Sequence, residues 1–415
     1  MRIAWTGEAG SLDADGVPGV AHQLRSGLAR RGHTIDVFFA VLERDEPDPA
    51  GESIPGMNLR PIRTGWNWGH WYARTPLLRF LSISVVRGIQ TPRIARAVMR
   101  AHRRAPYDVI FQMSQIEHAF PRERSRRPAL VIHPCTLAGL EARWHLRERR
   151  LALQAEPIAR FAIFQAVLSA RSWLQPRCAR AADLIVAPSI RFGRLASETL
   201  GLDPGRVVTL RHPVDVARFR PGAERRPPPW RALFIGTLST RKGLELIVDL
   251  SRRLDDLAGE LTITVVGAPR WWSDYSHLLA GANERLVSQA GYVSPDEIVT
   301  LLQDADLLIV PSRFEPGSIV TGEALACGVP VVASNAVGPS EILDDGCGRI
   351  FADGDAAALE AATRELLASL ASDGGALRAA SRTRAVEQLS TDVVADQLDA
   401  ILRAAVGAAD RGVTA

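Results

Sequence analysis

The alternation of short apolar runs with stretches of helical periodicity constrains the fold of this chain more than any other feature. At the start, an apolar run at Arg2–Thr6 leads into a loop rich in Gly and Asp, then into apolar residues at helical spacing that stop at Gly32. A second apolar run, Thr34–Ala40, follows directly. This order predicts a strand, a loop, a helix and a parallel strand, which together form a βαβ unit.

The same alternation continues along the chain and starts anew after the Pro-rich run Gly222–Pro229, which marks a domain boundary. Two consecutive series of this kind predict an α/β fold with two Rossmann-like domains, each a parallel sheet covered by helices. Before the boundary, the further elements are strands at Val109–Gln112, Ala129–Ile132 and Leu184–Val186 and helices at Thr91–Arg104 and Glu141–Arg180. After the boundary, they are strands at Ala232–Ile235, Thr262–Val266, Leu307–Val310 and Val329–Ala333, and helices at Leu244–Leu257, Pro295–Gln303 and Val320–Cys327.

We place the first domain at residues 1–212 and the second at 213–390, and we expect the helical residues 391–415 to return to the first domain. A chain of 415 residues, 47% of them hydrophobic, is long enough for two cores. The N-terminus lacks the pattern of a signal peptide, and no apolar stretch free of charge reaches the 18 residues of a membrane span. The four cysteines show no paired spacing, so we interpret them as reduced thiols of a cytoplasmic protein.

Charge is divided unevenly between the two halves. Up to His212 the sequence holds 31 arginines and 18 acidic residues, a net charge of +13, whereas the remainder carries −9. A basic half favours an anionic partner, such as a phospholipid surface, a lipid phosphate or nucleic acid. Solvated surface arginine explains the same excess equally well. Since no recognisable nucleic-acid-binding module is present, we do not expect a nucleic-acid partner.

One lysine, Lys242, stands among 49 arginines. It follows the predicted strand Ala232–Ile235, next to Arg241, and a helix begins near Gly243. Because open α/β sheets bind ligands at the carboxyl ends of their strands, the two cations are predicted at the mouth of the second sheet. A compact ammonium and a planar guanidinium there suit phosphate groups. Chance survival of a single lysine is the alternative interpretation.

A second loop is predicted at the same edge, after the strand Leu307–Val310, and leads directly into a helix. The first amides of that helix lack partners within the helix and suit an anion such as a diphosphate. Two glutamates eight residues apart would repel phosphate, so we expect them to accept hydrogen bonds from sugar and ribose hydroxyls. A solvated charged turn before a core helix is the alternative. The candidate ligand-binding residues here are Glu315, Gly317, Ser318, Ile319, Val320 and Glu323.

These segments resemble the retaining glycosyltransferases of family 4, which have the GT-B fold of two Rossmann-like domains facing each other across a cleft. That family has a Lys-Gly loop and a segment of the form EPFGIVxxEAMAxGxPVVAS, and the residues from Glu315 to Ser334 resemble this segment. The resemblance runs through most of the chain. Further similar segments are His212–Phe219 (PNGVDxxRF in the family), Ala290-Gly291-Tyr292 (FxGxV) and Gly338–Glu341 (GGxxE).

The resemblance implies a role for each residue of the second domain. Lys242, with Arg241, would neutralise the diphosphate of a UDP- or GDP-linked sugar as it leaves. Glu323 would bind the ribose hydroxyls, and Glu315 would hold hydroxyls of the sugar. The amides at Ser318, Ile319 and Val320 would hold the same phosphates.

In the first domain, the resemblance implies that Gly19, in Pro18-Gly19-Val20, belongs to a glycine loop that closes over the donor. His133, at a predicted strand end, would lie near the sugar, although a strand-end histidine with a purely structural partner is the alternative. The implied reaction is a hexosyl transfer to a hydroxyl acceptor with retention of anomeric configuration, in cell-surface polysaccharide or glycolipid synthesis. We expect no metal and no cofactor, with Asp13-x-Asp15 as a weak exception.

The sequence departs from the family pattern at three places. Thr237 stands where the family usually has Arg, which makes Arg241 the candidate second cation. Gly317-Ser318 replaces a common Phe-Gly, so the loop could hold the sugar differently. The segment Phe111-Gln112-Met113 replaces a His-x-His strand end, which removes polar groups from the possible acceptor side.

The acceptor, a glycan, a glycolipid or a small molecule, is expected on the basic first domain. Arginine clusters and neighbouring aromatic residues there suggest peripheral contact with the inner face of an anionic membrane. A core or sugar-stacking role for the tryptophans is an equal alternative. The residues are Arg122, Arg124, Arg126, Arg127, Arg143, Arg147, Arg149, Arg150, Trp66, Trp68, Trp71 and Tyr72.

Three other functions share the predicted architecture. In a phosphorylase, Lys242 would hold pyridoxal phosphate as a Schiff base. A sugar-nucleotide epimerase would act without an acceptor, and a non-catalytic nucleotide-sugar-binding protein would bind the donor without turnover. A nicotinamide enzyme is not expected, because no GxGxxG follows the first strand.

Overall fold

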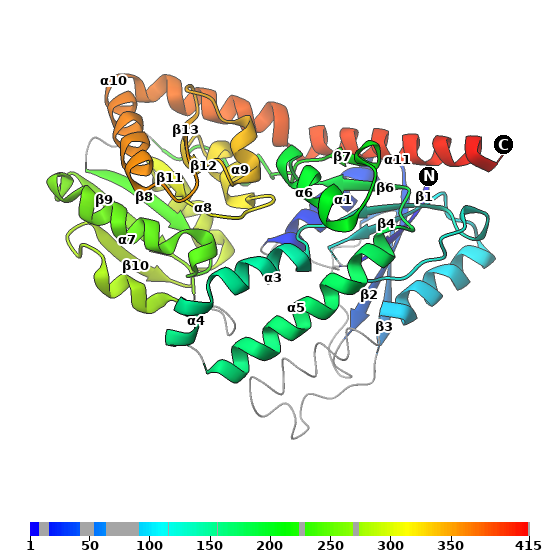
Figure 1. Ribbon diagram of the computed structural model, residues 1–415. Coiled ribbons are helices and arrows are strands. Elements are labelled where there is room, and N and C mark those ends of the chain that lie inside the picture. Colours follow the sequence, from blue (N-terminus) through cyan, green and yellow to red (C-terminus); the bar gives the residue numbers. More distant parts are fainter. Residues whose placement is uncertain are drawn as a thin grey trace. The chain divides into compact units, whose positions relative to one another are not determined.

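The computed structural model describes residues 1–7, 16–41, 54–63, 91–114, 116–155, 157–223, 229–268 and 274–413. The predicted loop with Trp66, Trp68, Trp71 and Tyr72, the pair Asp13 and Asp15, and most of the Pro-rich run lie outside these residues. The chain forms two compact units (Figure 1). The first comprises Met1–Arg147, Ile158–Leu210 and Val394–Ala415, and the second comprises Glu148–Pro157 and Arg211–Val393.

The first unit contains a seven-stranded parallel sheet of order β3-β2-β1-β4-β5-β6-β7. Ile3 of the central strand pairs with Ile35 on one side and Val109 on the other, and all three side chains are buried. This burial is typical of a parallel sheet that helices cover on both faces. The strands are β1 (Arg2–Thr6), β2 (Thr34–Val41), β3 (Met57–Arg63), β4 (Val109–Met113), β5 (Ala129–His133), β6 (Leu184–Ala187) and β7 (Val207–Thr209).

The second unit contains a six-stranded parallel sheet of order β10-β9-β8-β11-β12-β13. In both sheets the strand order reverses once, between β1 and β4 and between β8 and β11. The carboxyl ends of strands at such a reversal are where open α/β sheets bind ligands. The strands are β8 (Trp230–Ile235), β9 (Leu261–Val266), β10 (Val287–Gly291), β11 (Leu307–Val310), β12 (Val331–Ser334) and β13 (Gly348–Phe351).

Helices follow most of the strands, as the sequence predicts (Figure 1). Those of the first unit are α1 (Val17–Arg30), a helix through residues 91–104, α3 (Ala138–Arg147), α5 (Ile158–Ala179) and α6 (Ile190–Leu200). Those of the second unit are α4 (Arg149–Ala155), α7 (Leu244–Arg253), α8 (Pro295–Asp304), α9 (Ile319–Ala326) and α10 (Ala356–Leu389), which is interrupted at Asp373. No helix within the described ranges has both the length and the apolar character that crossing a bilayer requires.

The single helix predicted at Glu141–Arg180 is wrong, because the structure divides this stretch into α3, α4 and α5. The chain passes from the first unit to the second at Glu148 and returns at Ile158, which one straight helix could not do. Pro157 stands immediately before α5, at a helix start, where its missing amide hydrogen costs no helical hydrogen bond.

The last helix, α11 (Thr391–Val413), belongs to the first unit from Val394 onward. Arg31 Nε donates a hydrogen bond to Asp396 Oδ1 at 2.6 Å. His33 Nε2 lies 2.9 Å from Asp399 Oδ1, and the imidazole is buried. These contacts attach the end of the chain to the segment between α1 and β2.

Candidate functional site

A tight turn at the end of β8 carries the two cations of the second unit. The turn Thr240–Lys242 begins after Ser239, whose hydroxyl accepts a hydrogen bond from the Lys242 amide at 3.3 Å. Gly243 ends the turn with φ = 78°, and a β-carbon there would lie 2.1 Å from the Pro311 carbonyl oxygen. Glycine is therefore required where the turn approaches the chain that follows β11.

The two loops at this edge meet through an ion cluster. Lys242 Nζ forms an ion pair with Glu315 Oε2, and Arg241 lies 3.4 Å from the same oxygen. Arg241 also donates a hydrogen bond to the Phe314 carbonyl at 3.0 Å. The Glu315 side chain is 12% exposed and that of Lys242 is 18% exposed. The structure thus brings together three residues that were predicted at two separate loops.

The cluster determines the charge state of Glu315. Burial by itself raises the pKa of this carboxyl group, because it penalises the charged form. The positive charges of Lys242 and Arg241, with a contribution from His212, outweigh burial and hold the pKa of Glu315 below its usual value. The carboxylate is therefore ionised at neutral pH, and one negative charge faces two positive ones.

Backbone hydrogen bonds fix the loop that carries Glu315. The Glu315 amide donates to the Ala336 carbonyl at 3.4 Å, and the Gly338 amide donates to the Glu315 carbonyl at 2.8 Å. On the other side, the Arg313 amide donates to the Arg241 carbonyl at 2.9 Å. The ends of β8, β11 and β12 are thus joined into one scaffold that holds the cluster in place.

The start of α9 follows this loop directly. Ser318 is the N-cap residue, its side chain is buried, and its hydroxyl has no hydrogen-bond partner within the described part of the chain. The first turn of α9 holds no acidic residue, so its amide groups keep the positive end of the helix dipole. The Gly317 carbonyl lies 3.1 Å from His212 Nδ1. This helix start has the properties of an anion site.

The other predicted residues near α9 occupy the places that the sequence gives them. Ile319 and Val320 form its first turn, and Glu323 lies one turn further along, partly buried. The backbone places Glu315 before the helix and Glu323 within it, as predicted. The buried thiol of Cys327, whose pKa burial and the nearby Glu323 raise to about 12, remains protonated.

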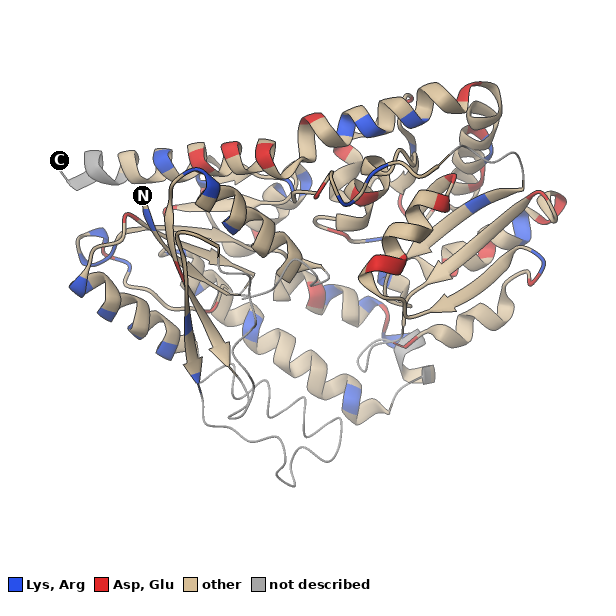
Figure 2. Cartoon of the chain, turned by 180° about the vertical axis from the view of Figure 1, so that it is seen from behind, with Lys and Arg blue, Asp and Glu red and all other residues tan. Residues whose placement is uncertain are grey.

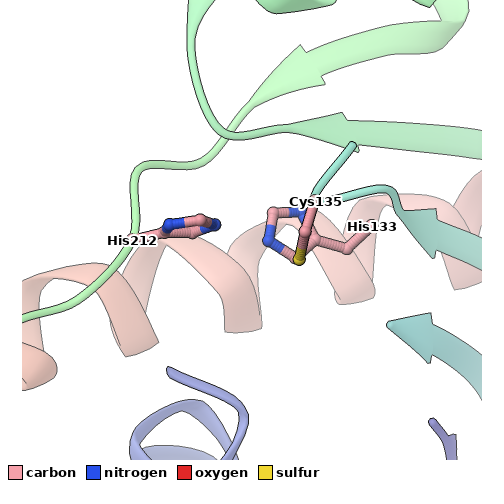
Figure 3. Close-up of side chains that lie close together, drawn as sticks. All are labelled: His133, Cys135 and His212. Atoms are coloured by element: carbon pink, nitrogen blue, oxygen red, sulfur yellow. The ribbon is translucent and has the colours of Figure 1, made fainter. Parts of the chain in front are cut away.

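The two predicted site residues of the first unit lie at β1–α1 and at β5. Gly19 lies in the first turn of α1 and not in a loop, because α1 begins at Val17 and Pro18 favours the first turn of a helix. His133 ends β5 and is fully buried, with Nδ1 2.6 Å from the Val186 carbonyl oxygen. Burial lowers the pKa of this imidazole to about 4, so it is neutral at physiological pH. Figure 3 shows the His133 ring beside Cys135, which follows β5.

The basic excess of the first unit is partly structural. In Figure 2 the helix through residues 91–104 carries basic positions and no acidic ones. Arg127, by contrast, is buried and forms an ion pair with Asp183 at 2.7 Å, and Arg124 pairs with the same carboxylate at 2.7 Å. Both arginines pair with a carboxylate that precedes β6, and the buried Arg127 is not available for a membrane surface.

Several residues that contact the cluster carry no sequence motif and are not among the predicted site residues. Glu245 accepts a hydrogen bond from Arg313 Nε at 2.6 Å, directly after the turn. Glu148 accepts hydrogen bonds from the hydroxyls of Thr240 and Tyr275. Glu148 stands in an arginine-rich stretch more than 90 residues before the turn, and no motif marks it.

Comparison with known proteins agrees with this geometry. Residues 230–369 match the family model described as Glycosyl transferases group 1. The D-inositol 3-phosphate glycosyltransferase of Geodermatophilus obscurus is 28% identical over 389 residues, which cover 87% of this chain and 79% of that protein.

Solved structures share the fold over nearly the whole chain. Sucrose-phosphate synthase from Thermosynechococcus elongatus has a TM-score of 0.71 at 19% identity, covering 98% of this chain and 99% of that one. Anabaena HepE in complex with UDP-glucose has a TM-score of 0.61 at 16% identity, covering 97% and 100%. These likenesses support glycosyltransferase activity for the chain and assign its two parallel-sheet units to the GT-B fold, with residues 230–369 matching the group 1 glycosyltransferases.

Proposed function

We propose that the protein is a retaining glycosyltransferase of family 4 that moves a hexosyl group from a UDP- or GDP-linked sugar to a hydroxyl acceptor. The cluster of Lys242, Arg241 and Glu315 supports this proposal, because two cations converge at the ends of the paired strands β8 and β11. The complexes of HepE with UDP and with UDP-glucose further support a nucleotide-sugar donor.

In this proposal the donor diphosphate replaces Glu315 as the anion that pairs with Lys242 and Arg241. The amides at Ser318, Ile319 and Val320 add hydrogen bonds from the start of α9, and Glu315 turns to the sugar hydroxyls. Negative charge develops on the diphosphate as the glycosidic bond breaks, so Lys242 and Arg241 stabilise the transition state more than the bound substrate. Arg241 then supplies the positive charge of the arginine that the family usually has at the position of Thr237.

We propose that no metal ion or other cofactor takes part. Lys242 and Arg241 supply the positive charge that divalent cations provide at many phosphate-transfer sites. The ion pair with Glu315 also stabilises the ammonium form of Lys242. A Schiff base with pyridoxal phosphate needs the neutral amine, so the ion pair favours a transferase over a phosphorylase.

We further propose that the first unit binds the acceptor in the cytoplasm, at the inner face of an anionic membrane, in polysaccharide or glycolipid synthesis. Trp173 is 64% exposed, and the Arg177 guanidinium lies 3.5 Å from the centre of its ring. An aromatic ring beside a cation is typical of membrane interfaces. The protein should float with vesicles containing anionic lipid at low salt and should not float with neutral vesicles. Absence of flotation would remove the membrane from the proposal.

The central experiment measures donor binding and turnover together. Calorimetry with UDP- and GDP-linked sugars should identify one donor that binds, and proton NMR of the product should show retained anomeric configuration. Turnover of the donor without any acceptor to an isomeric nucleotide sugar would identify an epimerase instead. Binding without turnover across a panel of glycan and glycolipid acceptors would identify a non-catalytic binding protein.

A further inference from the structure

A carboxylate from the first half of the chain, Glu148, lies beside the turn that carries the two cations. The chain leaves α3 at Arg147, and the next residue, Glu148, already belongs to the second unit together with α4. Glu148 accepts a hydrogen bond from the Thr240 hydroxyl on one carboxylate oxygen and from the Tyr275 hydroxyl, at 3.3 Å, on the other. Both carboxylate oxygens are therefore engaged by the second unit.

The two partners of Glu148 lead directly to the turn. Thr240 is its first residue, precedes Arg241 and Lys242, and is 4% exposed. Tyr275, 2% exposed, donates its backbone amide to the Leu238 carbonyl at 3.1 Å, just before the turn. Glu148 thus contacts the turn directly through Thr240. Through Tyr275 it also contacts the segment that is hydrogen-bonded to Leu238, just before the turn.

The surroundings of Glu148 disfavour the charged form of its carboxyl group. Burial raises the pKa of Glu148, the hydroxyls of Thr240 and Tyr275 and the charge of Arg241 oppose that rise, and the negative charge of Glu245 adds to it. A buried carboxylate that served packing alone could be replaced by an apolar side chain with little loss of stability. Its contacts, however, all lie on or next to the turn that carries the cations.

We propose that Glu148 is a positioning residue for the diphosphate site, which fixes Thr240 and Tyr275 and thereby holds Arg241 and Lys242 in the geometry that an anionic donor needs. This inference rests on the proposed function, because it assumes that the turn binds the diphosphate of the donor. Glu148 is accordingly part of the donor site, although it comes from a distant part of the sequence.

The test compares variants in which the hydroxyl–carboxylate contact is lost or kept. Thr240→Val removes the hydroxyl at nearly constant volume, whereas Thr240→Ser keeps a hydroxyl that can still reach Glu148. Glu148→Ala removes the carboxylate, and Glu141→Gln, which alters a carboxylate on α3 that accepts a hydrogen bond from Thr136 at 3.3 Å, is the matched control. Affinity for UDP and for GDP is measured by calorimetry, and the melting temperature without ligand is measured for each variant.

We expect Thr240→Val and Glu148→Ala to weaken binding of the nucleoside diphosphate by about tenfold or more, since each breaks a hydrogen bond to a charged group. Thr240→Ser should restore most of the affinity, and Glu141→Gln should leave it unchanged. Variants that melt earlier but bind the diphosphate as the wild type does would overturn the positioning role. If the wild-type protein binds neither UDP nor GDP, the proposed function itself fails, which a loss confined to the variants would not imply.

Discussion

The carboxyl ends of the two parallel sheets differ in charge. In the second unit, the ends of β8 and β11 bring Lys242, Arg241 and Glu315 together, and all three carry charge at neutral pH. In the first unit, the corresponding edge carries His118, 3.2 Å from the Thr6 hydroxyl, and His133 at the end of β5. Burial lowers the pKa of both imidazoles to about 4, so both rings are neutral at physiological pH.

The difference indicates what each unit is suited to bind. A cluster that already contains two cations can pair with a phosphate once its internal carboxylate turns away. Neutral imidazoles and hydroxyls suit hydroxyl groups, which both donate and accept hydrogen bonds. We therefore propose that one fold, used twice, offers an anion site in one unit and a site for hydroxyl groups in the other.

Removal of Lys242 is expected to have the largest effect and tests the charged cluster of the second unit most directly. Lys242→Ala should lower kcat by roughly 100- to 1000-fold, because one preorganised charge at the leaving group is lost. Steady-state kinetics with the cognate donor and acceptor would measure the effect. Arg285→Ala, which removes a cation whose side chain is 69% exposed on the same unit, should leave kcat unchanged. Wild-type turnover in Lys242→Ala would show that the charged edge is not catalytic.

A second test concerns the stability that Glu315 contributes. Its pKa is lowered in the folded protein, so its contribution is complete above its usual value of 4.5 and is lost as pH falls through the lowered pKa. Glu315→Gln should reduce the free energy of unfolding at neutral pH by about 2 to 3 kcal/mol, since it breaks a largely buried ion pair.

Urea denaturation across acidic and neutral pH would measure this contribution. The loss should shrink as the pH becomes acidic and the wild-type carboxyl group is protonated. Glu284→Gln, at an exposed side chain of the same unit, is the control and should change stability little at any pH. A loss that is independent of pH would indicate a packing defect and not an electrostatic role.

The neutral edge can be tested through its histidines. His118 has a folded-state pKa of about 4, against 6.5 for an ordinary histidine, so the unfolded chain takes up a proton that the folded one refuses. Its contribution to stability is complete above 6.5 and is lost as pH falls toward 4, by up to about 3 kcal/mol.

NMR titration of the imidazole signals would give the pKa of His118 and of His133 directly. His118→Gln should lose part of the acid sensitivity between these two pH values. An imidazole that titrates near 6.5 in the folded protein would show that these histidines can carry positive charge. The contrast in charge between the two units would then disappear.

The smallest effect is expected from removal of metal ions. If Lys242 and Arg241 neutralise the diphosphate by themselves, excess EDTA should change kcat by less than about twofold. The same assay with added Mg²⁺ or Mn²⁺ serves as the comparison. Activity that EDTA abolishes and a divalent cation restores would show that the charged edge is incomplete without a metal.

The central strands of both sheets could be predicted from the sequence, but the outermost strands could not. The central strands β1 and β11 coincide with the predicted ranges, because strands buried on both faces appear as continuous apolar runs. The residue pattern missed β3, β7, β10 and β13, which are the outermost strands of the two sheets. The outermost strands lack a continuous buried run, since most residues of β10 are exposed and β3 contains Pro61, which is tolerated at an edge.

The candidate site divides in the same way. Lys242 and Glu315 could be predicted because each follows an apolar strand and precedes a helix, a local arrangement that the sequence displays. Glu148 could not be predicted, because its partners Thr240 and Tyr275 lie 92 and 127 residues away along the chain. Only the folded path through α3 and α4 brings it to the turn.

The docking of α11 has a consequence for biosynthesis. The first unit is assembled from three separate stretches, and the last begins at Val394. A ribosome synthesises the chain from its N-terminus onward. Asp396, the partner of Arg31, and Asp399, the partner of His33, therefore emerge after the whole second unit. The unit that begins first therefore acquires α11 only after the second unit has been synthesised.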